Sequence, residues 1–262
     1  MINLIHGDCI EKLKDIPSES VDLVVTSPPY DNLRTYNNSS MWNFDLFKQI
    51  AQELTRTLKQ GGVIVWVIGD ATVKGTETLS SFKQAIFFKE QCNLNLHDTM
   101  IYHKDNPPPV GGSNRYYSAF EYMFVFSKGK PKTFNPIIQP RRNKHCDKRT
   151  HRTKVMNRES DGTFKIKNVK INENVKVQNV WTYVVSGGSS STDKIAHQHP
   201  AIFPEKLAQD HILSWSNELD LVLDPFMGSN TTGKMCKILN RNFIGIEIDE
   251  TYYNIAKQRL EL

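Results

Sequence analysis

Residues 221–233, LVLDPFMGSNTTG, join an apolar run to a turn of small residues and the start of a helix. This order of strand, turn and helix is typical of nucleotide-type sites in α/β sheets. Gly228 lets a ligand approach the backbone closely, and Glu247 ends the next expected strand about twenty residues later, where an acid accepts hydrogen bonds from ribose hydroxyls. The stretch therefore predicts an α/β fold with a nucleotide-type site.

The same turn has a second interpretation, because Gly228 to Lys234 also fits the first seven positions of a phosphate-binding GxxxxGK loop. The eighth position of that loop needs Ser or Thr to hold magnesium, and here it is Met235, which cannot hold the metal. No second acidic strand for the metal follows. A P-loop ATPase acting on nucleic acid is therefore a disfavoured alternative to the nucleotide-type site. A glycine-containing turn that binds no ligand is the second alternative.

Outward from this stretch, apolar runs alternate with helical patterns, which predicts βα units and a mostly parallel sheet. The expected strands are residues 4–5, 21–26, 63–68, 121–126, 219–223 and 243–248. The expected helices are residues 9–16, 43–58, 82–90, 204–215, 231–239 and 252–260. The Gly61-Gly62 pair is expected to stop the second of these helices.

A second motif, Ser27-Pro28-Pro29-Tyr30, follows the strand expected at 21–26. Functional groups in open α/β sheets lie at the carboxyl ends of strands. An exocyclic amine is a poor nucleophile because its lone pair is delocalised into the ring, and the Ser27 hydroxyl and Pro28 carbonyl are acceptors that can localise it. Two prolines make the turn rigid and poor in donors.

The aromatic ring of Tyr30 suits a base that has swung out of the duplex, since such a base gains stacking energy on a flat side chain. Acceptors beside the amine would stabilise the positive charge that develops as the nitrogen is alkylated. Taken alone, the tetrapeptide also fits a surface turn after a strand.

Residues 26–30 (TSPPY), 224–228 (DPFMG) and 245–247 (GIE) together resemble the DNA amino-methyltransferases, specifically the circularly permuted group with its catalytic motif near the N-terminus. The resemblance implies a Rossmann-like S-adenosylmethionine-dependent methyltransferase sheet, mostly parallel with one antiparallel strand. It implies catalytic roles for Ser27, Pro28, Pro29 and Tyr30. It implies S-adenosylmethionine binding by Asp8, Thr26, His199, Pro200, Phe203, Asp224, Pro225, Phe226, Gly228, Ser229, Asn230, Thr231 and Glu247.

Two positions refine this resemblance. Asn230 stands where the family has a third glycine, and Asn tolerates positive φ better than most residues, so the turn is expected to persist with weakened cofactor affinity. Ser before Pro-Pro-Tyr is typical of cytosine-N4 enzymes, whereas Asp there is typical of adenine-N6 enzymes. The expected function is cytosine-N4 methylation of DNA in a restriction-modification system. Adenine-N6 methylation and a DNA-binding protein without chemistry are the alternatives.

Charge is unevenly distributed along the chain of 262 residues with net charge +5. Residues 128–176 hold fifteen Lys or Arg against four acids, and the rest is acidic, with 18 against 24. This predicts an inserted DNA target-recognition region at 127–196 within a catalytic domain of 1–126 and 197–262. The expected DNA-binding residues are Arg141, Arg142, Lys144, Lys148, Arg149 and Arg152. A solvated loop is the alternative, and the Gly-Ser run at 186–191 is expected to be a linker.

Several classes are excluded by composition. The four cysteines never form a CxxC pair, so neither a zinc knuckle nor a disulfide framework is expected, and His145, Cys146 and His151 make a weak metal site. The longest apolar stretch, residues 63–68, is too short to span a bilayer, and the N-terminus is no signal peptide. We therefore expect a cytoplasmic protein without metal, whose partners are double-stranded DNA, a restriction endonuclease and, as an open option, a second copy.

Overall fold

The computed structural model describes residues 1–30, 42–107, 114–141, 154–168, 173–185 and 190–261. The chain forms two compact units, one made of Met1–Asn135 with Asn179–Leu262 and the other of Pro136–Gln178. The smaller unit lies inside the predicted insertion at 127–196. It is shorter than that prediction because the flanking residues on both sides belong to the larger unit.

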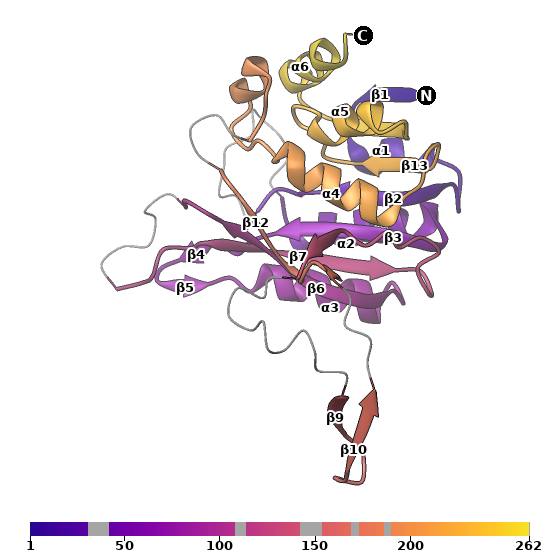
Figure 1. The fold of residues 1–262 in the computed structure, drawn as a ribbon. Coiled ribbons are helices and arrows are strands. Elements are labelled where there is room, and N and C mark those ends of the chain that lie inside the picture. Colours follow the sequence, from indigo (N-terminus) through magenta and orange to yellow (C-terminus); the bar gives the residue numbers. More distant parts are fainter. Residues whose placement is uncertain (31–41, 108–113, 142–153, 169–172, 186–189, 262) are drawn as a thin grey trace. The chain divides into compact units, whose positions relative to one another are not determined.

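An eight-stranded sheet forms the centre of the larger unit (Figure 1). In spatial order its strands are β1 (Ile2–His6), β14 (Asn242–Glu247), β13 (Leu221–Asp224), β2 (Val21–Thr26), β3 (Leu58–Ile68), β7 (Phe120–Ser127), β6 (Asn95–Lys104) and β12 (Val180–Tyr183). Neighbouring strands run parallel except that β7 is antiparallel to both β3 and β6. This confirms the prediction of a mostly parallel sheet with one antiparallel strand.

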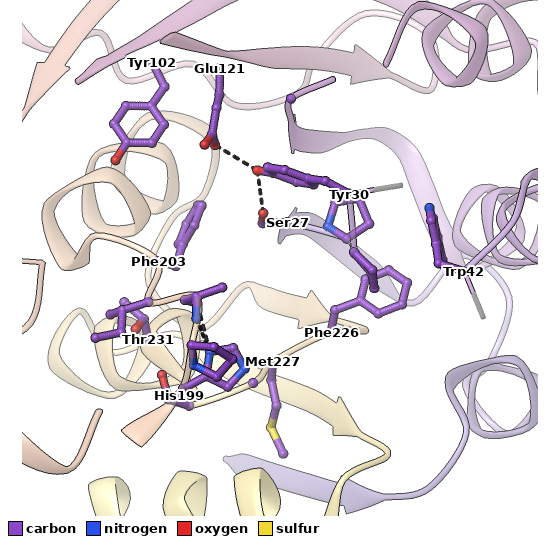
Figure 2. Close-up of a pocket in the computed structure, with 18 of the residues that line it drawn as sticks. Ser27, Tyr30, Trp42, Tyr102, Glu121, His199, Phe203, Phe226, Met227 and Thr231 are labelled. Carbon is purple, nitrogen blue, oxygen red and sulfur yellow. Dashed lines mark hydrogen bonds between the residues drawn. The ribbon is translucent and has the colours of Figure 1, made fainter. Parts of the chain in front are cut away.

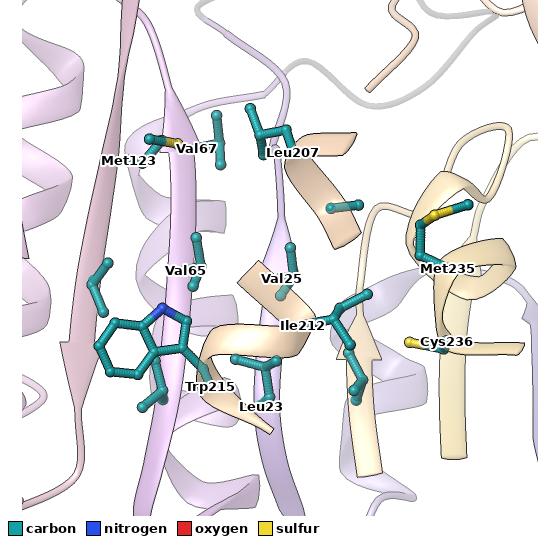
Figure 3. Close-up of a cluster of buried hydrophobic side chains, with 14 of the residues drawn as sticks. Leu23, Val25, Val65, Val67, Met123, Leu207, Ile212, Trp215, Met235 and Cys236 are labelled. Atoms are coloured by element: carbon teal, nitrogen blue, oxygen red, sulfur yellow. The ribbon is translucent and has the colours of Figure 1, made fainter. Parts of the chain in front are cut away.

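Helices cover both faces of this sheet, which makes a three-layer α/β fold. One face carries α1 (Cys9–Lys14), α2 (Phe44–Thr57) and α3 (Ser80–Glu90), and the other carries α4 (Glu205–Trp215), α5 (Thr231–Ile238) and α6 (Glu250–Leu260). Alternate strand residues point to opposite faces, so Val24 and Ile64 pack toward α1–α3 while Val25 and Val65 pack toward α4–α6 (Figure 3). Burial on both faces explains why the strands read as continuous apolar runs.

The prediction that Gly61-Gly62 ends a helix is wrong in its details. Helix α2 ends at Thr57, and β3 begins at once and runs through both glycines. Gly61, with φ of +80°, donates its N–H to the Lys128 carbonyl, and Lys128 in turn donates to the Gly62 carbonyl. The glycines therefore belong to the sheet, where positive φ accommodates an irregularity in the strand.

Short elements complete the described chain. The larger unit also has the hairpin β4 (Thr72–Val73) with β5 (Thr76–Glu77) and the 3-10 turn η1 (Lys194–Gln198). The smaller unit pairs β8 (Ile138–Pro140) with β11 (Asn174–Lys176) and β9 (Lys154–Arg158) with β10 (Phe164–Asn168), both antiparallel. Among the residues that the structure describes, no helix has the length and apolarity needed to cross a membrane.

Part of the predicted Gly-Ser linker is packed against α4 instead. Ser190 and Ser191 are buried. The Ser190 carbonyl accepts the backbone N–H of Glu205, and the Ser191 hydroxyl lies 2.6 Å from Glu205 Oε1. The linker prediction is therefore wrong for these two residues, because their polar groups satisfy the first turn of α4; residues 186–189 lie outside the described chain.

Candidate active site

The two motifs that the sequence singled out meet at the centre of the sheet. Strands β2 and β13 are neighbours, with Leu23 opposite Val222 and Val24 opposite Leu223. At their carboxyl ends the Thr26 hydroxyl donates a 2.7 Å hydrogen bond to Asp224 Oδ1, although 198 positions separate the two residues in sequence. The predicted catalytic and cofactor-binding motifs therefore lie side by side, as the predicted site requires.

A cavity of about 1810 Å³ opens above these strand ends, within the larger unit (Figure 2). It is lined by most of the predicted site residues, namely Asp8, Ser27, Pro28, Pro29, Tyr30, His199, Pro200, Phe203, Asp224, Pro225, Phe226, Gly228, Ser229, Thr231 and Glu247. A space of this size is large enough for a nucleotide-type cofactor and a base together.

Two predicted cofactor-binding residues, Thr26 and Asn230, lie behind the cavity wall. Both are buried, and the Thr26 hydroxyl donates its hydrogen bond to Asp224. Asn230 adopts φ of 64° and ψ of 45°, and its Oδ1 accepts the Gly233 N–H at 3.0 Å, which caps α5. Cofactor binding by these two residues stays a prediction; the expectation that Asn230 preserves the turn agrees with its left-handed backbone.

Gly228 packs closely against the His199 ring in the turn that follows β13. Its φ of +49° lies in the left-handed region, and a Cβ at this position would lie 2.9 Å from His199 Nε2. The His199 ring is held in place, because it packs edge-on against Tyr252 at 4.4 Å and its Nδ1 lies 2.9 Å from the Ala201 carbonyl oxygen. Only glycine fits here without displacing a buried ring.

Glu247 connects the cofactor turn to the end of β14. Its Oε2 accepts the Gly228 N–H and its Oε1 accepts the Asp249 N–H, each at 2.9 Å. Each carboxylate oxygen keeps a second lone pair, which is available to a hydroxyl in the cavity. Burial raises the pKa of Glu247 to about 7, against the opposing effect of the two backbone hydrogen bonds.

This pKa leads to a prediction about Glu247→Gln. Because the carboxylate is lost on protonation, affinity for a ribose-containing cofactor should fall several-fold between pH 8 and pH 6 in the wild type. In the variant that pH dependence should be weaker than in the wild type, and at pH 8 binding should be weaker by about 1 to 3 kcal/mol. Calorimetric titration with S-adenosylmethionine at both pH values measures the difference. Equal affinities of variant and wild type at pH 8 would contradict the ribose contact.

Asp224 joins the two motifs through its buried carboxylate. Oδ1 accepts hydrogen bonds from Thr26 and from the Phe226 N–H at 3.1 Å, and Oδ2 accepts one from Thr232 at 2.8 Å. Burial raises the pKa of Asp224 to about 6, and these hydrogen bonds oppose the rise. The residue fixes the start of the cofactor turn relative to the end of β2.

Sequence reasoning missed several residues that line the cavity around the Ser27–Tyr30 motif. Trp42 meets Phe226 edge-on at 5.5 Å, and both rings line the cavity. Tyr102, Lys104 and Glu121 line it from β6 and β7. The only sequence signal for Glu121 was its charge within an otherwise aromatic and apolar strand, residues 120–126. Nothing in the sequence pointed to β6, whose apolar pattern is weak.

An ion-pair network supports the cofactor turn from behind. The fully buried side chain of Arg259 lies 3.0 Å from Asp193 and 3.1 Å from Glu205, and it also donates to the Ser229 carbonyl. Lys234 pairs with the same two acids, at 2.9 and 2.8 Å. Lys234 is thus committed to the network and is absent from the cavity lining, which counts against a P-loop.

The remaining predicted residues concern DNA and metal. Arg141 is exposed in the smaller unit, where its N–H donates to the Glu173 carbonyl at 2.8 Å. Arg142, Lys144, Lys148, Arg149 and Arg152 lie outside the described residues, as do His145, Cys146 and His151. Within the described ranges no group of His, Cys, Asp or Glu is arranged to hold a metal ion, and Cys9, Cys92 and Cys236 are free thiols.

The fold and cavity define an α/β protein with a nucleotide-type site beside a rigid acceptor-rich turn, and comparison with known proteins makes this specific. A family model for N6/N4 methyltransferases, described as DNA methylase, matches residues 21–258. The chain is 54% identical over 258 residues to the orphan methyltransferase M.BamHII of Bacillus amyloliquefaciens, covering 97% of this chain and 90% of the relative. It is 30% identical to the Type II methyltransferase M.HinfI of Haemophilus influenzae, covering 98% and 67%.

Solved structures agree with these sequence comparisons. The PvuII cytosine-N4-specific DNA methyltransferase superposes with a TM-score of 0.70 at 21% identity, over 98% of this chain and 86% of that one. M1.HpyAVI in complex with S-adenosylmethionine gives 0.66 at 27% identity, over the whole of both chains. The chain belongs to the N6/N4 DNA methylase family.

Proposed function

We propose that this chain transfers a methyl group from S-adenosylmethionine to the exocyclic N4 of cytosine in double-stranded DNA. The observation that carries the proposal is the shared cavity, in which the Ser27 hydroxyl and the Gly228 turn face one space while the Thr26–Asp224 hydrogen bond holds their strands together. Membership of the DNA methylase family makes the chain a DNA methyltransferase. The choice of cytosine is our inference from Ser27.

The residues present fit S-adenosylmethionine, which supplies an electrophilic sulfonium methyl group when bound. Gly228 leaves the backbone accessible beside His199, where any Cβ would collide with the ring. Glu247 has lone pairs for the ribose hydroxyls. Asp8 also lines the cavity, and its side chain accepts the Ile10 N–H at 2.7 Å; we assign it to the adenine amine.

The catalytic turn is suited to an aromatic amine. Ser27 and Pro28 offer a hydroxyl and a carbonyl oxygen to the amine hydrogens, and such acceptors favour the charge that develops on nitrogen. Pro29 adds rigidity, and the Tyr30 ring provides a face for the flipped base. The motif order, with this turn N-terminal to the cofactor motif, supports assignment to the circularly permuted group.

Nucleoside mass spectrometry tests the proposal. Unmethylated plasmid DNA incubated with the protein and S-adenosylmethionine should yield N4-methylcytosine. A product of N6-methyladenine alone would establish the alternative specificity. Absence of both, with S-adenosylmethionine still bound, would point to a DNA-binding protein that has lost its chemistry.

The smaller unit is our candidate for target recognition. It carries twelve Lys or Arg against four acids, a balance that favours phosphate contacts. We also propose that this region spans residues 127–196 and that the protein acts in the cytoplasm. The proposed DNA contacts are Arg141, Arg142, Lys144, Lys148, Arg149 and Arg152.

Pairing with a restriction endonuclease is supported by relatives named Type II methyltransferases, although M.BamHII is described as orphan. A homodimer is tested by analytical ultracentrifugation.

A further inference from the structure

The hydroxyl of Tyr30 lies between two oxygen atoms from different parts of the fold. Tyr30 Oη is 2.8 Å from Glu121 Oε2 on β7 and 2.9 Å from Ser27 Oγ after β2 (Figure 2). A weaker contact of 3.3 Å joins it to the Val67 carbonyl. The second carboxylate oxygen of Glu121 is 2.5 Å from Lys104 Nζ on β6. Four side chains, from β6, β7 and the turn after β2, thus form one hydrogen-bonded row that ends at Ser27.

The direction of each hydrogen bond between Ser27, Tyr30 and Glu121 follows from the Glu121 carboxylate. An ionised carboxylate only accepts, so Tyr30 donates its single O–H hydrogen to Glu121, in the shorter, charge-assisted bond. The Ser27–Tyr30 bond then needs its hydrogen from Ser27. Once Ser27 has donated that hydrogen, its Oγ faces the cavity with acceptor capacity only. Lys104 occupies the other oxygen of Glu121, which leaves Oε2 to Tyr30.

We propose that Glu121 is a positioning residue for methyl transfer, which acts through Tyr30 to keep Ser27 Oγ an acceptor for the hydrogens of the target amine. The inference rests on the proposed function. It explains why a charged residue stands in the apolar strand β7, where the side chains of Glu121 and Lys104 are only 17% and 20% exposed. Without Tyr30 as its acceptor, the Ser27 hydroxyl could donate to the amine nitrogen instead. That hydrogen bond would occupy the lone pair that must attack the methyl group.

Glu121→Gln tests the inference, because the amide keeps the shape of the side chain and can donate to Tyr30, which reverses the row. We expect kcat on unmethylated plasmid DNA to fall about 10- to 100-fold, the size of effect typical of groups that orient a reacting residue. The KM for DNA and the Kd for S-adenosylmethionine should stay within about twofold of wild type, since neither ligand is bound through the direction of a hydrogen bond.

The same substitution in a Tyr30→Phe background shows whether the effect passes through the hydroxyl. Tyr30→Phe removes the connecting oxygen, so adding Glu121→Gln should lower kcat by less than about twofold further. Equal losses in both backgrounds, or no loss in either, would overturn the inference. Glu19→Gln is the matched control: Glu19 pairs with Lys128 at 3.1 Å, lies outside the cavity lining, and should leave kcat unchanged.

Two further measurements, of folding and of product identity, distinguish failure of this inference from failure of the proposed function. If circular dichroism shows that Glu121→Gln is unfolded, Tyr30→Phe alone carries the test, and a wild-type kcat in that variant overturns the inference. A wild-type protein that methylates no DNA refutes the proposed function, a result visible before any variant is made. If the wild-type product is N6-methyladenine, only the choice of base fails, and the row is tested on that amine in the same way.

Discussion

Tyr30→Ala should reduce kcat for methyl transfer roughly 100- to 1000-fold, because it removes both the stacking surface for the flipped base and the hydroxyl bonded to Ser27. Base–aromatic stacking alone contributes about 1 to 3 kcal/mol. The ring lies at the catalytic end of the cavity, whereas the cofactor turn is built by Gly228 and Glu247. The Kd for S-adenosylmethionine should therefore change by less than about twofold.

Filter binding with tritiated S-adenosylmethionine and single-turnover methyl transfer separate these two quantities. Tyr30→Phe is the internal control, since it keeps the ring and loses only the oxygen, and its rate should lie between those of wild type and Tyr30→Ala. A parallel loss of cofactor binding in Tyr30→Ala would show that the ring belongs to the cofactor site instead.

Gly228→Ala should weaken S-adenosylmethionine binding by on the order of 100-fold, since displacement by about 1 Å at such a site has effects of this size. The new Cβ would lie 2.9 Å from His199 Nε2 and 3.1 Å from Cε1, and the buried ring cannot turn away without losing Tyr252. The left-handed backbone adds roughly 1 to 2 kcal/mol of strain for any residue with a Cβ.

Gly75→Ala separates strain from crowding in this experiment. Gly75 also has positive φ, +79°, but nothing lies within 4 Å of a Cβ built there, and it does not line the cavity. This control should lose some thermal stability and keep the wild-type Kd. Gly228→Ala binding the cofactor as tightly as Gly75→Ala would mean that the turn opens more easily than the His199 packing indicates.

The sheet was largely predictable because its strands are buried on both faces. Residues 21–26 and 63–68 read as apolar runs, and helices appear between them with the expected period. Strand β6 escaped prediction because its burial alternates irregularly around a shift between Leu96 and Asp98. Strand β12 escaped because it is a four-residue edge strand in which only Tyr183 is buried. Local composition carries little signal for such strands.

The candidate site was predictable to the extent that its residues follow strand ends. Ser27 to Tyr30 and Asp224 to Gly228 were found in this way, since adjacent parallel strands present their carboxyl ends to one cavity. Glu121 and Arg259 were not, because their contacts with the motifs, Glu121 with Tyr30 and Arg259 with the Ser229 carbonyl, exist only in the tertiary structure. No spacing rule connects such residues to a motif more than thirty positions away.

Translation produces β2 long before β13, although the two strands are neighbours in the sheet. The 198 positions between Thr26 and Asp224 must leave the ribosome before their hydrogen bond can form. Until then the Ser27–Tyr30 turn lacks its neighbouring strand, and the central strand β2 has one edge unpaired. A chain that stops before β13 lacks the Thr26–Asp224 hydrogen bond and leaves one edge of β2 exposed, so we expect it to be inactive and susceptible to proteolysis.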